Sequence, residues 1–282
     1  MSRPLFSIVT VTLNAGVDLT ATAKSVADQN MISYEHIIKD GGSFDNSLAL
    51  LKKDNNQRII IKPDSGIYDA MNQALEYCTG KYILFLNAGD VFASSDVLSL
   101  VANTLVYCDT PEIVYTHIKN KRYGTMQIYP PILNRAFLYR RSLCHQGTYI
   151  RSDCYAKYGN FDLTYRILAD NEFLLRLLTN DARAVLCDCT GVIYSGEGFS
   201  VKSSNAVWVL RELKRIREKY FTKFEQLYLG VLWHLTMPAL RIWLISNIKS
   251  QRFQNIYAFA ANMLNRRTFI DNKISLRKTK IK

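Results

Sequence analysis

The first half of the chain alternates between short apolar runs and segments with helical spacing. The apolar runs are rich in β-branched residues and nearly continuous, which is typical of strands buried on both faces of a sheet. They cover residues 6–13, 36–39, 58–61 and 82–86. The segments with helical spacing cover residues 19–29, 47–53 and 68–78. Strands separated by helices of this length predict βαβ units and a parallel sheet.

The second half is less regular at first and then becomes helical. Residues 112–118 and 182–186 predict two further strands, and residues 170–178 predict a helix with one apolar face. Beyond these the pattern changes to long helices. We therefore expect an α/β domain over residues 1–204 and a separate helical extension over residues 205–282.

The charge distribution supports this division. The chain has 282 residues, with 36 Lys and Arg against 24 Asp and Glu. Residues 1–200 hold 19 basic and 20 acidic residues, whereas residues 201–282 hold 17 and 4. The net positive charge therefore lies in the extension, where it suits an anionic membrane surface. Nucleic acid is not expected as a partner, because no nucleic-acid-binding signature accompanies the charge.

One segment of the extension raises the question of a membrane span. Residues 227–248 are largely apolar, but His234, Pro238 and Arg241 interrupt them. A spanning helix needs about 20 predominantly apolar residues with few charges. The pattern favours an amphipathic helix that lies on a bilayer over a helix that crosses it.

The six cysteines indicate a reducing compartment. They show no CxxC spacing, and a chain of this length can bury a core without disulfides. Cys187 and Cys189 are the one close pair, and we expect their side chains to face opposite sides of a strand. The first residues carry no signal-peptide cleavage pattern, so we expect the α/β domain to stay in the cytoplasm.

Acidic side chains follow three of the predicted strands. Asp40 and Asp90 stand at the ends of their strands, and Asp64 closely follows a third. Ligands of an open α/β sheet bind outside the carboxyl ends of its strands, so we expect these carboxylates to share one crevice. A single strand-terminal Asp would indicate little, because Asp is common in turns and helix caps. Three of them in one half-sheet favour a shared site.

These carboxylates fit the transfer of a sugar from a nucleoside diphosphate. A departing diphosphate stabilised by a divalent cation needs no protonation, so one carboxylate that deprotonates the acceptor hydroxyl can suffice. Mg²⁺ and Mn²⁺ prefer oxygen ligands, and Asp90 is placed to provide one. Asp40 is placed to accept hydrogen bonds from a base or ribose, and Asp170 lies at the start of a later helix.

Six segments in order carry a resemblance to a known family. They are SIVTVTLN at 7–14, HIIKDGGS at 36–43, DSGIYDAMN at 64–72, FLNAGD at 85–90, HQ at 145–146 and ADNEFLLR at 169–176. In addition, GEGFS at 196–200 resembles the glycine-serine segment that follows the last conserved helix of the family's catalytic domain. The chain resembles the family 2 glycosyltransferases over roughly residues 5–200. It is most similar to the subgroup that builds bacterial surface polysaccharides, including O-antigen, capsule and colanic acid. The resemblance implies a GT-A fold, which is a Rossmann-like, mostly parallel sheet flanked by helices.

The resemblance also implies roles for individual residues. Asp40, with Val11 and Thr12 beside it, resembles the acid that contacts the nucleobase. Asp90 resembles the last acid of the metal-binding motif, and Asp170 resembles the catalytic base of an inverting transfer. The remaining candidates for binding the nucleotide sugar are Gly41, Asp64, Asn72, Asn87, His145 and Gln146.

The family pattern leaves two points open. Asn87 and Gly89 stand where many relatives carry acids, so Asp90 is the only carboxylate of that turn. Fewer anionic ligands should weaken metal binding, with diphosphate and water supplying most ligands of the cation. Glu172 stays a second candidate for the base. It points about 200° away from Asp170 on a helix, so only one of the two faces the cleft.

The resemblance implies a metal-assisted, inverting hexosyltransferase. It would move a sugar from a nucleotide donor to a lipid-linked saccharide in surface polysaccharide biosynthesis. The enzyme would lie peripherally on the cytoplasmic face of a bacterial inner membrane, with its basic extension on the anionic lipids. Two alternatives stay open. A nucleotidyltransferase usually needs a basic Gly-rich phosphate loop, which does not follow the first strand here, and the reduced 87–90 turn motivates a non-catalytic nucleotide-sugar-binding scaffold of an assembly complex.

Overall fold

The computed structural model describes residues 3–30, 33–52, 54–196 and 205–236. Their backbone divides into two compact units. The first comprises Met1–Ile132 and Arg141–Tyr220, and the second comprises Leu133–Arg140 and Phe221–Lys282, each within the described residues. The first unit therefore runs past residue 204, where the hydrophobic pattern changes, and it includes the first helix that follows.

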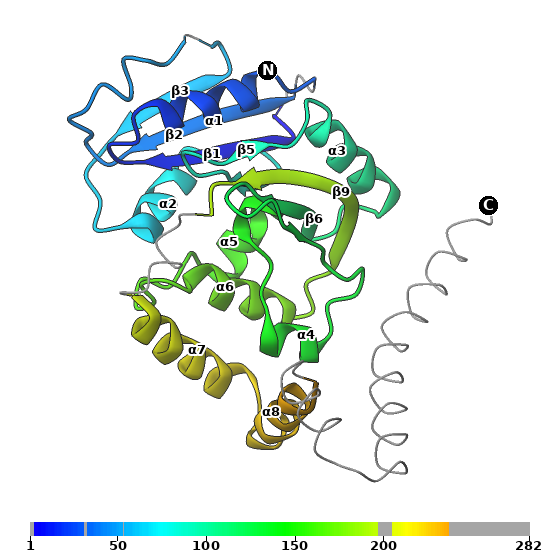
Figure 1. Ribbon diagram of the computed structural model, residues 1–282. Helices are drawn as coiled ribbons and strands as arrows, with labels where there is room; N and C mark the ends of the chain where they lie inside the picture. The colour runs from blue at the N-terminus through cyan, green and yellow to red at the C-terminus, as the bar shows by residue number, and fades with distance from the viewer. Residues whose placement is uncertain (1–2, 31–32, 53, 197–204, 237–282) are drawn as a thin grey trace. The chain divides into compact units, whose positions relative to one another are not determined.

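The first unit is built on one mixed sheet (Figure 1). In the described residues its strands are β1 (Phe6–Thr12), β2 (Tyr34–Asp40), β3 (Gln57–Ile61), β4 (Tyr82–Phe85), β5 (Val91–Phe92), β6 (Ile113–Asn120), β7 (Met126–Gln127), β8 (Thr148–Arg151) and β9 (Ala184–Tyr194). They are ordered β3-β2-β1-β4-β8-β6-β9-β5, with β7 paired to β6. Strands β1 to β4 are parallel, and β6 is parallel to β9. Strand β8 runs antiparallel to both of its neighbours.

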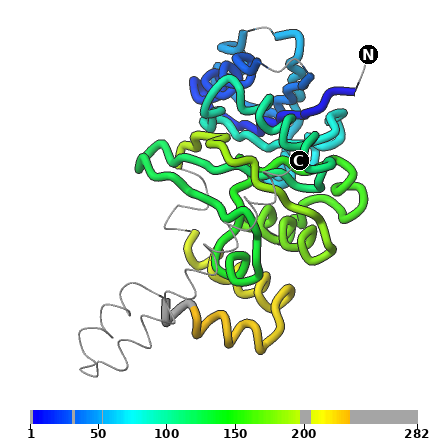
Figure 2. The backbone as a smooth tube through the Cα atoms, turned by 90° about the vertical axis from the view of Figure 1, so that its right-hand side faces the viewer, coloured from blue at the N-terminus to red at the C-terminus, as the bar shows by residue number. Residues whose placement is uncertain are grey.

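Helices flank this sheet. Those described in the first unit are α1 (Val17–Ala27), α2 (Ile67–Leu75), α3 (Val97–Tyr107), α5 (Asp153–Tyr158), α6 (Ala169–Leu178) and α7 (Ala206–Tyr220), and a 3₁₀ turn, η1, spans His145–Gly147. Helix α1 packs on β1 and β5, α2 packs on β1 and β2, and α3 packs on β6 and β9. Helix α6 contacts both α5 and α7. Two views place β1 to β3 at one end of the unit and the yellow α7 towards the other (Figures 1 and 2).

Strands β1 and β4 form the centre of the core. Every residue of β1 and of β4 is buried, which explains why these runs lack a polar face. The parallel register pairs Thr12 with Asp40 and Val9 with Phe85. The carboxyl ends of β1, β2 and β4 therefore open on one edge of the sheet, as the alternating pattern predicts. The prediction of an α/β fold with a mostly parallel sheet flanked by helices is confirmed.

The predicted helix over residues 47–53 is wrong. Residues 45–50 form bends and turns between β2 and β3. The Asp45 carboxylate accepts hydrogen bonds from the backbone N–H of Ser47 and of Gly16, both at 3.0 Å. Asp45 therefore binds this loop to the segment after β1. A short polar side chain that bonds to nearby backbone competes with helix formation, which explains the difference.

The expected orientation of the close cysteine pair is also wrong. Residues two apart on a strand share a face, and the Sγ atoms of Cys187 and Cys189 lie 3.5 Å apart on β9. All six cysteines are free thiols, in agreement with the expectation of reduced side chains.

The second unit, described by itself, pairs α4 (Arg135–Arg140) with α8 (Lys223–Thr236). Arg135 forms an ion pair with Glu225, and the hydrogen bonds from Arg135 and Thr222 lower the pKa of Glu225 to about 2. The rings of Tyr139 and Phe221 meet edge to face, with centroids 5.3 Å apart. No helix in the described part of the chain is long and apolar enough to cross a membrane. The rest of segment 227–248 and the basic C-terminal residues lie outside the described residues.

Candidate active site

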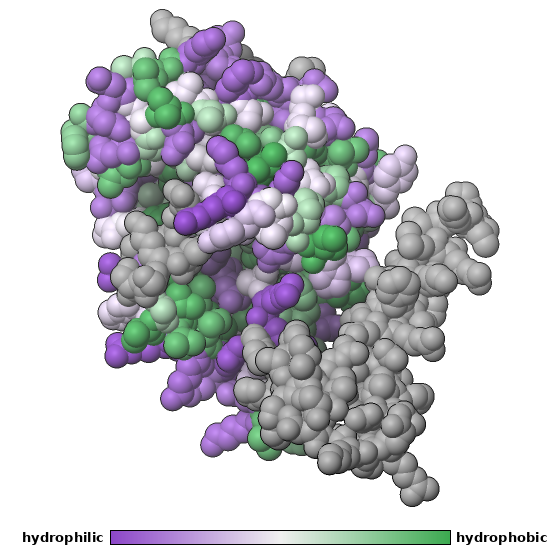
Figure 3. Space-filling model, in the orientation of Figure 1, coloured by the Kyte–Doolittle hydropathy of each residue, from purple (hydrophilic) through white to green (hydrophobic). Residues whose placement is uncertain are grey.

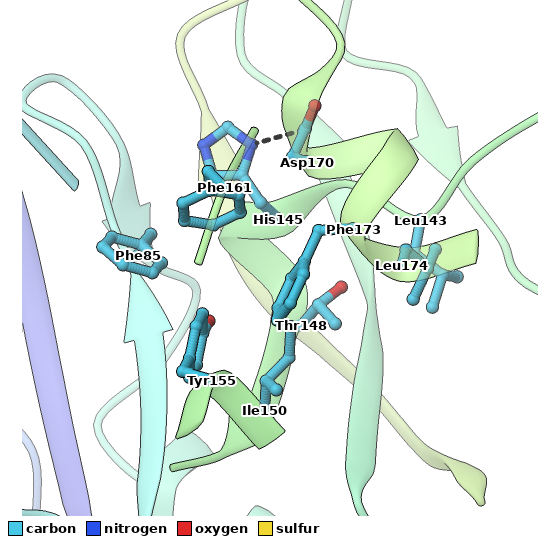
Figure 4. A pocket seen from close by; sticks show the side chains of 10 residues that line it. All are labelled: Phe85, Leu143, His145, Thr148, Ile150, Tyr155, Phe161, Asp170, Phe173 and Leu174. Carbon is cyan, nitrogen blue, oxygen red and sulfur yellow. Dashed lines mark hydrogen bonds and ion pairs between the residues drawn. The ribbon is translucent and has the colours of Figure 1, made fainter. Parts of the chain in front are cut away.

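Asp170 lies in the first turn of α6 and is held by two side chains from other elements. His145 of η1 places its Nδ1 atom 3.0 Å from Asp170 Oδ2. The Tyr68 hydroxyl of α2 lies 2.8 Å from Asp170 Oδ1 and 2.5 Å from the backbone oxygen of Ile167. Figure 4 shows the contact between His145 and Asp170 as a dashed line. The side chains of His145 and Asp170 are 19% and 21% exposed, so the pair is partly open to solvent.

The surroundings keep Asp170 ionised. Burial raises the pKa of this carboxyl. The hydrogen bond and the charge of His145, together with the hydrogen bond from Tyr68, lower the pKa by more than burial raises it. The net result is a pKa below the ordinary value for Asp. Burial and the Asp170 charge hold the pKa of Tyr68 far above its ordinary value, so its hydroxyl stays a donor. At neutral pH Asp170 is therefore a carboxylate that can accept a proton.

The turn η1 connects Asp170 to the loop after β4. His145 Nε2 lies 3.1 Å from the Nδ2 atom of Asn87. The next residue, Gln146, donates from Nε2 to Asp90 Oδ2 at 3.0 Å. The backbone N–H of Ser195 donates to the other oxygen of Asp90 at 2.9 Å. The structure thus brings Asn87, Asp90, His145, Gln146 and Asp170 together.

Glu172, the second candidate for the base, is enclosed by other side chains that bond to it. Its side chain is fully buried. Its carboxylate accepts hydrogen bonds from Arg176 at 2.6 Å, from Lys219 at 2.7 Å and from Tyr220 at 2.5 Å. Burial raises its pKa, and these three donors lower it below the ordinary value. A buried carboxylate with three donors has no access to an acceptor, so the geometry favours Asp170 as the base.

A second group of candidates lies at the ends of β2 and β3. The buried Asp40 accepts hydrogen bonds from the backbone N–H of Gly42 at 3.0 Å and of Ser43 at 2.7 Å. The fully buried Lys39 forms an ion pair with Asp64. A Cβ atom on Gly41 would lie 2.8 Å from Asp64 Oδ2, so this position has no room for a side chain. Asp40, Gly41 and Asp64 therefore lie close together at the ends of β2 and β3.

The remaining candidates lie beside these groups. Val11 and Thr12 are buried at the end of β1, and the Thr12 backbone oxygen accepts the Gly41 N–H at 2.9 Å. Asn72 on α2 has a different kind of partner. Its amide donates to the backbone oxygen of Phe161 at 2.9 Å and accepts from the Phe161 N–H at 3.0 Å. Asn72 therefore fixes the turn before α6.

One family accounts for this arrangement. The family model described as "Glycosyl transferase family 2" matches residues 7–159, which is more than half of the chain. The match includes the strand ends that carry Asp40, Asp64 and Asp90. The chain is a family 2 glycosyltransferase. The predicted family and enzyme class are thereby confirmed.

Individual relatives agree with this assignment. The glycosyltransferase is 34% identical over 191 residues to a "PGL/p-HBAD biosynthesis glycosyltransferase" of Mycobacterium bovis, which covers 64% of this chain and 73% of the relative. Its fold is similar to S. aureus TarS 1–349 in complex with UDP-GlcNAc, with a TM-score of 0.61, 17% identity, and 88% of this chain and 77% of that chain covered. It is also similar to a mannosyltransferase of Pyrobaculum calidifontis in complex with GDP-Man and Mn²⁺, with a TM-score of 0.58 and 13% identity, over 94% of this chain and 81% of that chain. These likenesses confirm the predicted GT-A fold.

The turn after β4 supplies few ligands for a divalent cation. Among residues 3–30, 33–52, 54–196 and 205–236, no group of three or more His, Cys, Asp or Glu side chains is arranged to hold a metal ion. Two oxygen atoms still fit this role. The buried Oδ1 of Asn87 has no hydrogen-bond partner among the described residues, and Asp90 lies in the same turn. Asn87 and Asp90 would therefore hold a cation that takes its other ligands from diphosphate and water.

The sequence did not indicate two residues that lie beside the candidate site of this glycosyltransferase. Tyr68 stands inside the segment 64–72 that resembles the family, but its hydrogen bond to Asp170 crosses 102 positions of sequence and leaves no local signal. Asp18 lies in the first turn of α1, where its position in the sequence indicates only a charge at a helix terminus. Its Oδ2 atom would lie 3.8 Å from a Cβ on Gly89, and its charge adds to the burial that raises the pKa of Asp90.

An apolar pocket lies behind the Asp170–His145 pair. Figure 4 shows rings of Phe85, Tyr155, Phe161 and Phe173 gathered beneath the two polar side chains. Phe161 lies 5.4 Å from Phe85 and 5.3 Å from Phe173, centroid to centroid. The cavity measures about 20 Å³, which is room for one or two water molecules. The rings therefore give one side of Asp170 an apolar environment.

The variant Tyr68→Phe tests how Asp170 is held. It removes a hydrogen bond that lowers the pKa of Asp170, so this pKa should rise. The base is active when ionised, so the acid limb of the pH profile of kcat/KM should move to higher pH by roughly one unit. The matched control is Tyr155→Phe, because the buried Tyr155 hydroxyl has no hydrogen-bond partner in the described residues. Superimposable profiles for wild type and Tyr68→Phe would contradict this role of Tyr68.

Proposed function

We propose that this glycosyltransferase transfers a sugar from a nucleoside diphosphate to a lipid-linked saccharide acceptor, with inversion at the anomeric carbon. One observation carries the proposal. An ionised, partly exposed carboxylate, Asp170, is fixed by His145 and Tyr68 beside the turn that holds Asn87 and Asp90. This arrangement supports a base and a diphosphate-binding turn at neighbouring positions in one cleft.

The proposed reaction is a single displacement. Asp170 accepts the proton of the acceptor hydroxyl while the hydroxyl oxygen forms a bond to the anomeric carbon. The bond from that carbon to the diphosphate oxygen breaks on the opposite face, and its electron pair leaves with the diphosphate. The enclosure of Glu172 by three donors supports the use of one carboxylate, because a single displacement needs only one.

The donor would lie along the edge of the parallel strands. Asp40 and Asp64, with Val11, Thr12 and Gly41 beside them, would bind the nucleobase and ribose. His145 and Gln146 would approach the diphosphate from η1. A divalent cation held by Asn87 and Asp90 would neutralise charge on the diphosphate. The solved relatives with UDP-GlcNAc and with GDP-Man and Mn²⁺ support this class of donor and of cation.

Apolar side chains on the C-terminal helices support a lipid-linked acceptor. On α8, Phe224, Leu227, Tyr228 and Val231 follow the i, i+3, i+4, i+7 spacing of one helix face, and each is at least 50% exposed. On α7, Val207, Trp208 and Leu210 are also exposed, and Figure 3 shows hydrophobic surface over this helix. Exposed apolar faces in a segment with 17 basic and 4 acidic residues suit an anionic bilayer.

The proposed acceptor would be an intermediate in the synthesis of a bacterial surface polysaccharide or glycolipid on the cytoplasmic face of the membrane. A lipid-linked acceptor is met at the bilayer surface, so the enzyme would bind there peripherally. The relative from Mycobacterium bovis, named for the biosynthesis of PGL and p-HBAD, supports an acceptor of this general kind.

The variant Asp170→Asn tests the proposed base. A thermal-shift screen of UDP-, GDP- and dTDP-sugars, with and without Mn²⁺, selects the donor. With that donor, kcat should fall by about 10³-fold, because a positioned base contributes roughly 10²–10⁴-fold. Donor affinity by calorimetry should change by less than about twofold. Asp28→Asn, which removes an exposed carboxylate from the end of α1, is the control.

Three outcomes would contradict the proposed reaction. Near wild-type turnover of Asp170→Asn would show that Asp170 is not the base. Donor binding by the wild type without transfer or hydrolysis would support a non-catalytic scaffold instead. A product with the same anomeric configuration as the donor, measured by NMR, would exclude a single displacement.

The apolar face of α8 can be tested with lipid vesicles. The double variant Leu227→Ser and Val231→Ser should reduce cosedimentation with vesicles of phosphatidylglycerol and phosphatidylethanolamine by about tenfold or more, since two apolar side chains no longer enter the bilayer. Val106→Ser on α3, which is 79% exposed, is the matched control. Unchanged vesicle binding by the double variant would contradict bilayer contact through α8.

A further inference from the structure

Helix α6, which carries Asp170, begins without a capping side chain of its own. Its N-cap residue is Leu168, which has no side-chain hydrogen-bond acceptor. The segment that leads into α6 is held by Glu212 on α7. Glu212 Oε1 accepts the backbone N–H of Arg166 at 2.7 Å, and Oε2 accepts those of Ile167 and Leu168 at 3.0 and 2.9 Å. The Glu212 residue is only 6% exposed, so this is an enclosed contact.

The three residues bound by Glu212 lead directly to the base. Leu168 lies two positions before Asp170, and its backbone oxygen accepts the first hydrogen bond of α6, from Glu172 N–H at 2.9 Å. The backbone oxygen of Ile167 lies 2.5 Å from the Tyr68 hydroxyl, which also bonds to Asp170. A shift of this segment would therefore change both the start of α6 and the Tyr68–Asp170 contact.

Further contacts show that α7 holds the segment on both sides of Asp170. Arg215 donates to Thr164 Oγ1 at 2.8 Å, and its guanidinium lies 4.2 Å from the centre of the Tyr165 ring. On the other side, Lys219 and Tyr220 donate to the buried Glu172. Arg215, Lys219 and Tyr220 all belong to α7. This helix follows, in the sequence, the region 7–159 that the family model matches.

A buried carboxylate is a costly way to hold a segment of backbone, because removing Glu212 from water is unfavourable. Glu212 offsets this cost by accepting three successive N–H groups, and it thereby fixes residues 166–168 to a second helix. The Glu212 charge also helps to hold the pKa of Tyr68 high, which keeps Tyr68 a donor to Asp170.

We propose that Glu212 is a positioning residue for the transfer reaction. It acts through the backbone of residues 166–168 and sets the place of the Asp170 carboxylate relative to His145 and Tyr68. The proposal rests on the role of Asp170 as the base. It makes α7 part of the catalytic unit, although the sequence pattern assigns this helix to the extension.

The variant Glu212→Gln tests this role, because it keeps the size of the side chain and replaces one acceptor oxygen with an amide donor. With the selected donor, kcat should fall roughly ten- to a hundredfold, because small displacements of a catalytic group have effects of this size. The KM for the donor should stay within about twofold. Glu218→Gln is the matched control, since Glu218 lies on the same helix, is 58% exposed and faces Lys214. The control should match the wild type.

A second measurement needs neither donor nor turnover. The chain has four histidines, so imidazole N–H resonances can be assigned by NMR with His145→Asn as the reference. The proton between His145 Nδ1 and Asp170 should resonate far downfield in the wild type and in Glu218→Gln. It should shift or disappear in Glu212→Gln, while the thermal melt of this variant stays cooperative. If Glu212→Gln fails to fold, Glu212→Asp, which keeps the charge on a shorter side chain, should show the same change.

The outcomes separate this inference from the proposed function. An unchanged His145 resonance in a folded Glu212 variant would overturn the positioning role, even if stability falls. Equal losses of kcat in Glu212→Gln and Glu218→Gln would also overturn it. A wild type without turnover would contradict the proposed function, and the resonance would still decide the role of Glu212.

Discussion

The site depends on keeping one carboxylate ionised in a partly enclosed position. Burial raises the pKa of Asp170, and hydrogen bonds from His145 and Tyr68 lower it again, so that the net shift is downward. Those two donors come from η1 and α2, so the state of Asp170 depends on how three separate elements pack. The aromatic rings beneath it, Phe161 and Phe173 among them, line an apolar pocket on one side of the carboxylate. The contacts of His145 and Tyr68 therefore set both the charge and the position of Asp170.

The parallel strands explain why the other polar groups lie at one edge of the sheet. Asp40 ends β2, Asp64 follows β3, and the turn with Asn87 and Asp90 follows β4. The turn η1 then connects this edge to the base, because His145 bonds to Asn87 and Asp170 while its neighbour Gln146 bonds to Asp90. In the proposed function, the sheet would supply the donor side of the cleft, and helix α6 would supply the base.

Local patterns in the sequence were sufficient to predict the parallel half-sheet and the acidic residues at the ends of its strands. Continuous β-branched runs mark buried parallel strands, and an Asp directly after such a run lies at the carboxyl edge wherever the run is placed. The structure adds what local patterns do not encode. The hydrogen bonds from the Tyr68 hydroxyl to Asp170 and from the Leu168 N–H to Glu212 cross 102 and 44 positions, and each depends on packing between helices. The choice between Asp170 and Glu172 likewise needed the partners of Glu172. The helix predicted over 47–53 was wrong because Asp45 bonds to the backbone of its own loop and of Gly16.

A crystal structure of the Asp170→Asn variant with an intact nucleotide sugar tests this account most directly. The diphosphate should lie beside the 87–90 turn and the nucleobase beside Asp40. The substituted side chain should lie within about 6 Å of the anomeric carbon, on the face opposite the diphosphate, which leaves room for one acceptor hydroxyl between them. An anomeric carbon more than about 10 Å from residue 170, or a diphosphate bound away from the 87–90 turn, would contradict the arrangement of base and leaving group described for this glycosyltransferase.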